Sequence, residues 1–291
     1  MKDWGRLITA MITPFHEDLS VNYEMAVKLA KKLVKEGNTA LVITGTTGEA
    51  PTLTREEKFE LYKTIKENVD VPIIAGVGTN STDVTIENAL DAKRAGVDGL
   101  LVVVPYYNKP DQDSLYEHFR KVAKSIDLPI MLYNVPGRTG SNLMPETVER
   151  LSKIDNIVAL KEASGDMVQL AKIIKLVAED FRVYSGDDIV LLPSMSIGAY
   201  GIVSVCSHVV SGDIKQMIEA FLAGDILKAQ TIHLKLLNIF QKLFMISNPI
   251  PVKAALNMMG IDVGGLRLPL TSARKYVLDE LKEELENLEI I

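Results

Sequence analysis

The chain repeats one pattern eight times: a short apolar run rich in β-branched residues, a loop, and a stretch with helical periodicity. In the first helical stretch, Ala26, Leu29 and Leu33 share one face, and Gly37 follows as a stop signal. Residues 40–44 form the next apolar run, as expected for a strand that is covered on both faces. Thr54 and Glu57 then make a capping box that begins the following helix. Since parallel strands need a crossover connection, usually a helix, this order predicts a parallel sheet.

Eight such units predict a closed (β/α)8 barrel, the TIM-barrel fold. A doubly wound open sheet is the alternative, but such a sheet normally stops at five or six strands, and the chain has no dinucleotide-binding fingerprint. Gly76 and Gly78 are followed by Ser81 where the third glycine of that fingerprint belongs, and no P-loop is present. The predicted strands are Leu7–Ile12, Ala40–Thr44, Pro72–Gly76, Gly99–Val104, Pro129–Tyr133, Ile157–Lys161, Arg182–Ser185 and Gly201–Val205.

From about residue 225 onward the chain shows helical periodicity and no strand signal. We therefore expect residues 1–224 to form the barrel that carries any site, and residues 225–291 to form a C-terminal helical extension. Leu281, Leu285 and Leu288 make one stripe in its last helix. The extension is expected to pack on the barrel or to form an oligomer surface.

Composition excludes several classes of protein. A net charge of -6 and a pI near 5.4 argue against a nucleic-acid binder. One cysteine excludes an internal disulfide, and the four histidines show no ligand spacing, so we expect no metal and no cofactor. Residues 189–212 lack charge and are long enough to span a bilayer, but they contain Pro193 and Gly198, and so two short buried elements are the better interpretation. The first residues lack the features of a secretory signal, and a cytoplasmic location is expected.

In such barrels the active site lies at the carboxyl ends of the strands, where this chain places polar residues. Lys161 ends the sixth strand on the same face as Ala159 and Ile157. If that face points inward, desolvation lowers the pKa of the amine, whereas an ordinary lysine is only about 0.04% free amine at neutral pH. Such a lysine suits Schiff-base chemistry, although an ion pair with Glu162 is the simpler alternative. Tyr133 ends the adjacent fifth strand, and its phenol suits proton transfer during imine formation. A tyrosine with its ring in the core and its hydroxyl in water is the simpler alternative.

Three loops add binding groups. Residues 45–49, Gly-Thr-Thr-Gly-Glu, place Thr46, Thr47 and backbone N–H groups near an anion such as a carboxylate. Residues 106–108, Tyr-Tyr-Asn, follow the fourth strand and fit either packing or an interface. Arg138 lies on a loop stiffened by Pro136 and suits bidentate carboxylate binding, although most loop arginines are merely solvated.

Together these segments resemble the dihydrodipicolinate synthase family, within the pyruvate-dependent class I aldolases related to N-acetylneuraminate lyase. The resemblance covers essentially the whole chain, and the segment with Arg138 is more specific to the synthase branch. The matching segments, in order, are Gly45–Glu49, Val104–Asn108, Tyr133–Gly140, Lys161–Ala163, Ser185–Asp188 and Asn248–Lys253.

The resemblance implies a reaction and roles for the site residues. Lys161 is expected to form an imine with pyruvate, whose enamine attacks aspartate semialdehyde to give 4-hydroxy-tetrahydrodipicolinate for lysine and diaminopimelate synthesis. Tyr133, Thr46 and Tyr107 relay protons, with Tyr107 reaching into a neighbouring subunit of a homo-oligomer, a dimer or tetramer. Substrate binding is assigned to Thr47 for the pyruvate carboxylate, to Arg138 for the semialdehyde carboxylate, and to the main chain of Gly186 and Val203. Asp187 and Asp188 are expected to cap a helix.

Two other functions stay open on the sequence alone. A related aldolase that cleaves a keto-deoxy sugar acid or sialic acid would keep Lys161 and Tyr133 but would not be expected to carry Arg138. A catalytically silent binding barrel should have lost a relay residue.

The resemblance also implies a lysine-inhibition pocket in many relatives, with a glutamate at the position of Val84. Here Val84 is apolar, with Arg55 and Lys58 nearby, and so insensitivity to lysine is expected.

Overall fold

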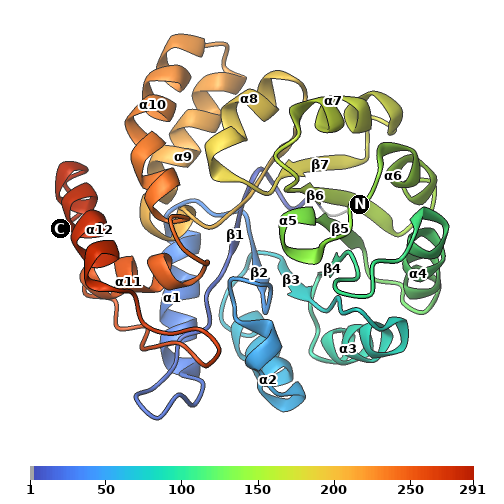
Figure 1. Cartoon of the computed structure of the whole chain (residues 1–291), viewed down its shortest axis with the longest axis horizontal. Helices are drawn as coiled ribbons and strands as arrows, with labels where there is room; N and C mark the ends of the chain where they lie inside the picture. The colour runs from blue at the N-terminus through green and yellow to red at the C-terminus, as the bar shows by residue number, and fades with distance from the viewer. Residues whose placement is uncertain (1–2) are drawn as a thin grey trace.

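The computed structural model, which describes residues 3–291, contains a closed barrel of eight parallel strands in sequential order (Figure 1). This confirms the predicted fold. The strands are β1 (Leu7–Ala10), β2 (Ala40–Ile43), β3 (Ile73–Gly76), β4 (Gly99–Val103), β5 (Ile130–Asn134), β6 (Ile157–Glu162), β7 (Arg182–Ser185) and β8 (Gly201–Ser204).

Helices surround the barrel, and α2 begins where the capping box predicts it. The Thr54–Glu57 capping box is present at the start of α2, and Asn22 caps α1 through its side chain. The helices that follow the strands are α1 (Tyr23–Lys35), α2 (Arg55–Lys66), α3 (Thr82–Arg94), α4 (Gln112–Lys124), α5 (Pro136–Thr139), α6 (Pro145–Leu151), α7 (Met167–Leu176), α8 (Leu191–Ser196) and α9 (Ser207–Leu222), with short 3-10 turns η1 (Ala50–Thr52) and η2 (Asp188–Val190).

The barrel has separate inner and outer apolar clusters. The outer cluster lies between the strands and the helices, and the inner cluster fills the barrel, with Trp4 at the amino-terminal end packed against Gly99. A strand that is buried on both faces explains why the strand sequences are apolar without alternation. Residues of the inner cluster include Ile8, Val42, Ile74, Leu101, Met131, Tyr133, Ala159 and Val203.

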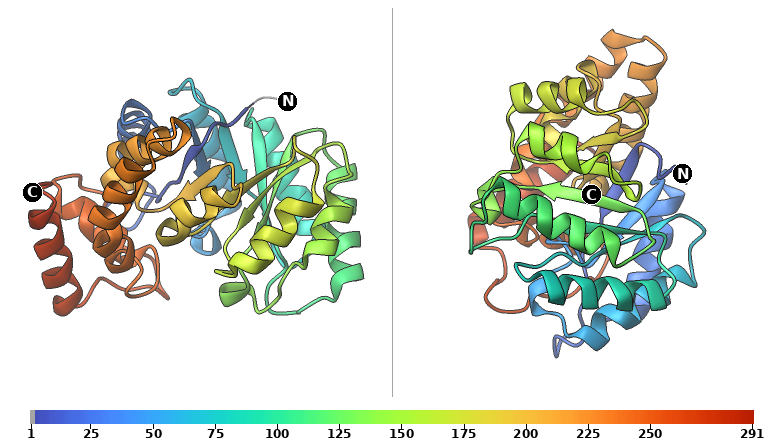
Figure 2. Two further views of the ribbon diagram at one scale, coloured as in Figure 1. Left: turned by 90° about the horizontal axis from the view of Figure 1, so that it is seen from above. Right: turned by 90° about the vertical axis from the view of Figure 1, so that its right-hand side faces the viewer.

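Three further helices follow α9: α10 (Ile226–Lys242), α11 (Ile250–Met258) and α12 (Lys275–Asn287). They gather beside α1 and α9 on one side of the barrel (Figures 1 and 2). Leu281 and Leu285 are buried in α12, as the predicted stripe requires.

The uncharged stretch at residues 189–212 folds into η2, α8, β8 and the start of α9, so it is divided among short elements. Within residues 3–291, no helix combines the length and the apolar character needed to cross a membrane.

Candidate functional site

Lys161 lies at the carboxyl end of β6 with only 4% of its surface exposed. Ala159 and Leu160 before it on the strand are apolar and buried, and Glu162 after it is also buried, so the amine is held away from water. Burial lowers the pKa of Lys161 to about 8; Asp188 opposes this shift, and Arg138 adds to it. A lysine with this pKa supplies a useful fraction of free amine at neutral pH, which is what a nucleophile for a carbonyl requires.

Tyr133 on β5 stands directly beside Lys161. The two residues are partners in the register of β5 and β6, and the Lys161 Nζ lies 4.5 Å from the centre of the Tyr133 ring. Burial raises the pKa of the Tyr133 phenol, although Arg138 and the side chain of Thr46 lower it in part. The phenol therefore stays protonated at neutral pH and is placed to give or take a proton close to the amine.

Gly186 follows β7 and gives Lys161 its space. A Cβ at position 186 would lie 2.7 Å from the Cβ of Ala163 and 3.0 Å from the Cε of Lys161. Its backbone N–H donates to the carbonyl oxygen of Glu162 at 2.7 Å, which joins the ends of β6 and β7. A residue with a Cβ at position 186 would therefore force the Lys161 side chain to move, and only glycine avoids this.

The 45–49 loop follows β2 and faces the same space. Thr46 and Thr47 both line the cavity described below, and the Thr47 hydroxyl accepts a hydrogen bond from Asn248 Nδ2 at 2.9 Å. The loop is folded on itself, because the N–H groups of Gly48 and Glu49 donate to the carbonyls of Gly45 and Thr46. Its two threonines are thus presented from a fixed turn.

Arg138 lies on α5, the short helix that follows β5, and its side chain is exposed toward the cavity. Within the part of the chain that the structure describes, its guanidinium has no hydrogen bond or ion pair. An arginine without a partner at the edge of a cavity is available to bind a carboxylate in bidentate geometry.

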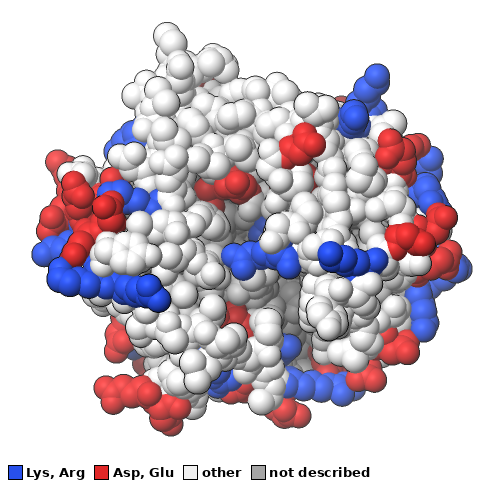
Figure 3. Space-filling view, viewed as in Figure 1, with Lys and Arg blue, Asp and Glu red and all other residues white. Residues whose placement is uncertain are grey.

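These groups surround one cavity of about 560 Å³ at the carboxyl ends of the strands. A second cavity of about 270 Å³ adjoins it, and both are lined by Thr46, Tyr133 and Arg138. In the view of Figure 3 this face of the molecule is hollowed near its middle, with Lys or Arg side chains at the edge of the hollow. The larger cavity has the size of a site for small molecules.

Two predicted site residues lie apart from the cavity wall. Val203 is fully buried in the inner cluster of the barrel, while Val205 lines the cavity. Tyr107 is 88% exposed, its backbone has a φ of 75°, and it lines neither of the two cavities. Its loop is held by a bond from the Tyr107 N–H to the carbonyl of Thr139, beside Arg138.

The two aspartates after β7 differ in role, which corrects one prediction. Asp187 caps η2 as expected, and its side chain accepts from the N–H of Ile189. Asp188 is not a helix cap: it is buried and accepts hydrogen bonds from Ser204 Oγ and from the N–H groups of Val205 and Cys206. It therefore joins η2 to the end of β8. Asp187 also lines the cavity, where burial and Asp188 raise its pKa.

The C-terminal helices contribute to the site, which was not predicted from the sequence. Residues of α10 and of the segment before α11 complete the wall of the larger cavity: Phe240, Gln241, Phe244, Met245 and Asn248. The only signal for them was the Asn-Pro-Ile-Pro-Val-Lys motif at 248–253, because periodicity shows which residues share a face but not which loops converge.

The chemistry of the site is that of an amine, a phenol and a guanidinium. Among residues 3–291 no group of three or more His, Cys, Asp or Glu side chains is arranged to hold a metal ion. The arrangement fits imine formation between Lys161 and a carbonyl compound that carries a carboxylate, with Thr46, Thr47 and Arg138 as carboxylate donors.

Comparison with known proteins agrees with this chemistry. Residues 3–288 match the model of the dihydrodipicolinate synthetase family. The 4-hydroxy-tetrahydrodipicolinate synthase of Thermosynechococcus vestitus is 51% identical over 100% of this chain and 99% of its own length, and that of Heliobacterium modesticaldum is 52% identical over 98% and 96%. The crystal structure of a dihydrodipicolinate synthase from Bacillus anthracis is 47% identical, with a TM-score of 0.97 over 98% of this chain and 99% of that chain. The structure of the Cyanidioschyzon merolae protein with lysine bound has the same TM-score at 44% identity, over 99% of each chain.

Proposed function

The chain belongs to the dihydrodipicolinate synthetase family, and we propose that it condenses pyruvate with L-aspartate 4-semialdehyde to 4-hydroxy-tetrahydrodipicolinate in lysine and diaminopimelate biosynthesis. One observation supports this most directly. Lys161, whose pKa burial lowers to about 8, stands beside Tyr133 in a cavity whose wall also carries Arg138, an arginine with no side-chain partner among residues 3–291.

The reaction begins at Lys161. Its free amine attacks the ketone carbon of pyruvate, and the carbinolamine loses water to give an imine, while Thr46 and Thr47 hold the carboxylate. Loss of a proton from the methyl carbon gives an enamine. The Tyr133 phenol is placed beside the amine to pass these protons, with Thr46 next to it.

The second substrate reacts with the enamine. The enamine carbon attacks the aldehyde carbon of the semialdehyde, whose alkoxide takes a proton, and Arg138 holds the carboxylate of this substrate. The amino group of the semialdehyde then attacks the imine carbon, and Lys161 leaves as the free amine. The reaction is thus a condensation of the two substrates with loss of one water, and its atoms balance without a cofactor.

The protein acts as a homo-oligomer in this account. Tyr107 is assigned to the relay of a neighbouring copy, and its exposure in the single chain supports this assignment. We also propose a cytoplasmic location, and a division into a barrel of residues 1–224 and an extension of residues 225–291.

The test compares substrates with one purified protein. Pyruvate with aspartate semialdehyde should be consumed with saturation kinetics, whereas keto-deoxy sugar acids and N-acetylneuraminate should not be cleaved above the rate without protein. Faster cleavage of a sugar acid would assign the protein to the related aldolases. Inactivity with every substrate would indicate a silent barrel.

A further inference from the structure

A buried ion pair lies behind the 45–49 loop and outside the proposed catalytic groups. Lys253 Nζ of α11 is 2.6 Å from Glu49 Oε1, and each side chain is only 1% exposed. Glu49 is the last residue of the loop and has a φ of 54°, a conformation that is uncommon for a residue other than glycine. Neither Lys253 nor Glu49 lines the two cavities whose walls include Tyr133.

Two contacts join the C-terminal extension to the loop, the ion pair itself and one further hydrogen bond to Glu49. The second oxygen of Glu49 accepts the backbone N–H of Arg267 at 3.1 Å. Lys253 Nζ also donates to the carbonyl of Gly265 at 2.7 Å and lies 4.1 Å from the centre of the Phe15 ring. The pair therefore connects α11, the segment at 265–267 and the end of the loop at one buried point.

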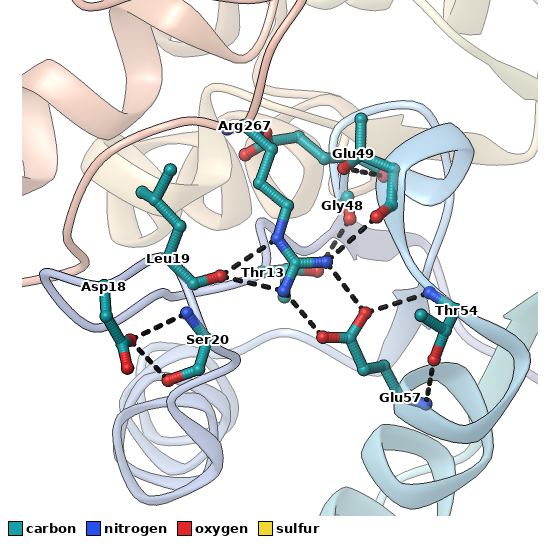
Figure 4. A network of polar contacts seen from close by, with 10 residues as sticks. Thr13, Asp18, Leu19, Ser20, Gly48, Glu49, Thr54, Glu57 and Arg267 are labelled. Atoms are coloured by element: carbon teal, nitrogen blue, oxygen red, sulfur yellow. Dashed lines mark hydrogen bonds and ion pairs between the residues drawn. The ribbon is translucent and has the colours of Figure 1, made fainter.

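Arg267 extends this connection to the start of α2. Its guanidinium donates to the carbonyls of Leu19 and Thr52 and forms an ion pair with Glu57 at 2.6 Å (Figure 4). Glu57 is the acid of the capping box that begins α2, so Arg267 joins the segment before α1 to the residues that follow the loop. The Thr13 hydroxyl also donates to the carbonyl of Gly48 in the loop (Figure 4).

A buried ion pair is a poor source of stability, because both charges must leave water. Its geometry is nevertheless strict, since removal of one partner leaves the other charge buried without compensation. Contacts of this kind fix the position of the backbone that carries them. Here that backbone carries Thr46 and Thr47, the proposed donors to the carboxylate of pyruvate.

We propose that Lys253 is a positioning residue for pyruvate binding, which acts from the C-terminal extension by fixing Glu49 and, through it, the 45–49 loop. This inference rests on the proposed function. It gives the extension a part in the reaction in addition to the wall residues that it supplies to the cavity. Lys161 and Arg138 lie on β6 and α5, and we expect loss of the pair to leave both in place.

The experiment measures how much pyruvate is needed for half-maximal labelling of Lys161 by pyruvate and borohydride. Lys253→Met and Glu49→Gln should each raise this concentration tenfold or more. The double variant should raise it no further than the larger single effect, because two residues that act as one unit give non-additive changes. The half-saturating semialdehyde concentration, measured with pyruvate in excess, should change less than twofold.

Lys242→Met is the matched control. Lys242 also belongs to the extension and pairs with Glu280 at 3.0 Å, but it joins α10 to α12 and has no contact with the loop. This variant should keep the pyruvate requirement of the unaltered protein. Melting temperatures of all variants are recorded alongside, since a purely structural role would lower them without changing the pyruvate requirement.

A folded Lys253→Met protein with a normal pyruvate requirement overturns the proposal, and so do additive effects of the two changes. If Lys253→Met does not fold, the double variant decides, because it buries no unpaired charge: a normal requirement overturns the proposal and a raised one supports it. If the unaltered protein is not labelled by pyruvate, the proposed function itself fails, and this inference falls with it.

Discussion

Lys161 shows how one residue acquires its chemistry from its position. Nothing in its own structure distinguishes it from the other lysines, but its strand ends inside the barrel, where desolvation disfavours the ammonium form. With the pKa at about 8, roughly a tenth of the amine is free at pH 7, whereas an ordinary lysine has about 0.04%. The sequence predicted where Lys161 lies and that its pKa is lowered. It did not show that Asp188, which opposes the shift, is buried nearby.

The lowered pKa of Lys161 predicts the pH dependence of imine formation. The free amine is the reactive form, so the rate of attack on pyruvate should rise with pH through about 8 and level off by about 9. The protein is mixed with limiting pyruvate at each pH and quenched with borohydride at increasing times. A rate that still rises about sevenfold between pH 9 and pH 10 would indicate an ordinary lysine with a pKa near 10.4 and would contradict the assignment.

Arg138 separates the two halves of the reaction. Arg138→Ala should still be labelled on Lys161, because the arginine is assigned to the second substrate only. Turnover with the semialdehyde should fall about ten- to a hundredfold, since a hydrogen bond to a charged group contributes about 1.5–3 kcal/mol. Arg150→Ala removes an exposed arginine that pairs with Asp113 and serves as the control. Loss of labelling in a folded Arg138→Ala protein would instead place the arginine at the pyruvate end.

At the scale of elements, the strands were predictable and the convergence of loops was not. All eight strands lie where apolar runs predict them, with ends that differ by at most two residues. Thr44, predicted as strand, has a φ of 56° and already belongs to the turn into the 45–49 loop. Asn248 and Phe244 reach the cavity from far along the chain, and no local pattern encodes such a meeting. The boundary between barrel and extension at residue 225 stays a prediction.

The second cavity bears on regulation by lysine. Its lining includes Lys58 of α2 and Arg138, and none of the described residues that line it is an aspartate or glutamate. Arg55 is paired with Asp91, and Val84 on α3 is half exposed and apolar. A ligand with two ammonium groups would therefore meet positive charge and no compensating acid.

We predict that the protein is insensitive to lysine. Leaving a ligand charge unpaired costs several kcal/mol, and each 1.4 kcal/mol is about tenfold in affinity. Initial rates should stay nearly flat up to millimolar lysine. Half-inhibition at submillimolar lysine would show that an acid outside this lining, such as one from a second copy, supplies the partner.

At the scale of the whole molecule, the cavity of a single chain brings together only part of the proposed proton relay. Lys161, Tyr133 and Thr46 meet in one cavity, while Tyr107 stands in solvent at 88% exposure. The sequence resemblance implied this arrangement, but composition and periodicity alone did not, because a contact between copies leaves no local pattern within one chain. The site would then be completed by assembly.

Mixing two inactive proteins tests this assembly. Lys161→Ala keeps Tyr107, and Tyr107→Phe keeps Lys161, so a mixed dimer contains one complete site. Activity should appear after the subunits are exchanged and should be absent when each variant is treated alone. No recovery, with mixed dimers demonstrated by mass spectrometry, would place Tyr107 outside its neighbour's site.

The central claim is that Lys161 forms the imine with pyruvate, and covalent trapping measures this directly. Borohydride with pyruvate should add one reduced pyruvyl group per chain, peptide mapping should locate it on Lys161, and Lys161→Ala should abolish it. Lys253 provides an internal comparison, since it is also a buried lysine but lies outside the cavity. A pyruvyl group on Lys253 or on any other lysine, or its persistence in Lys161→Ala, would contradict the account.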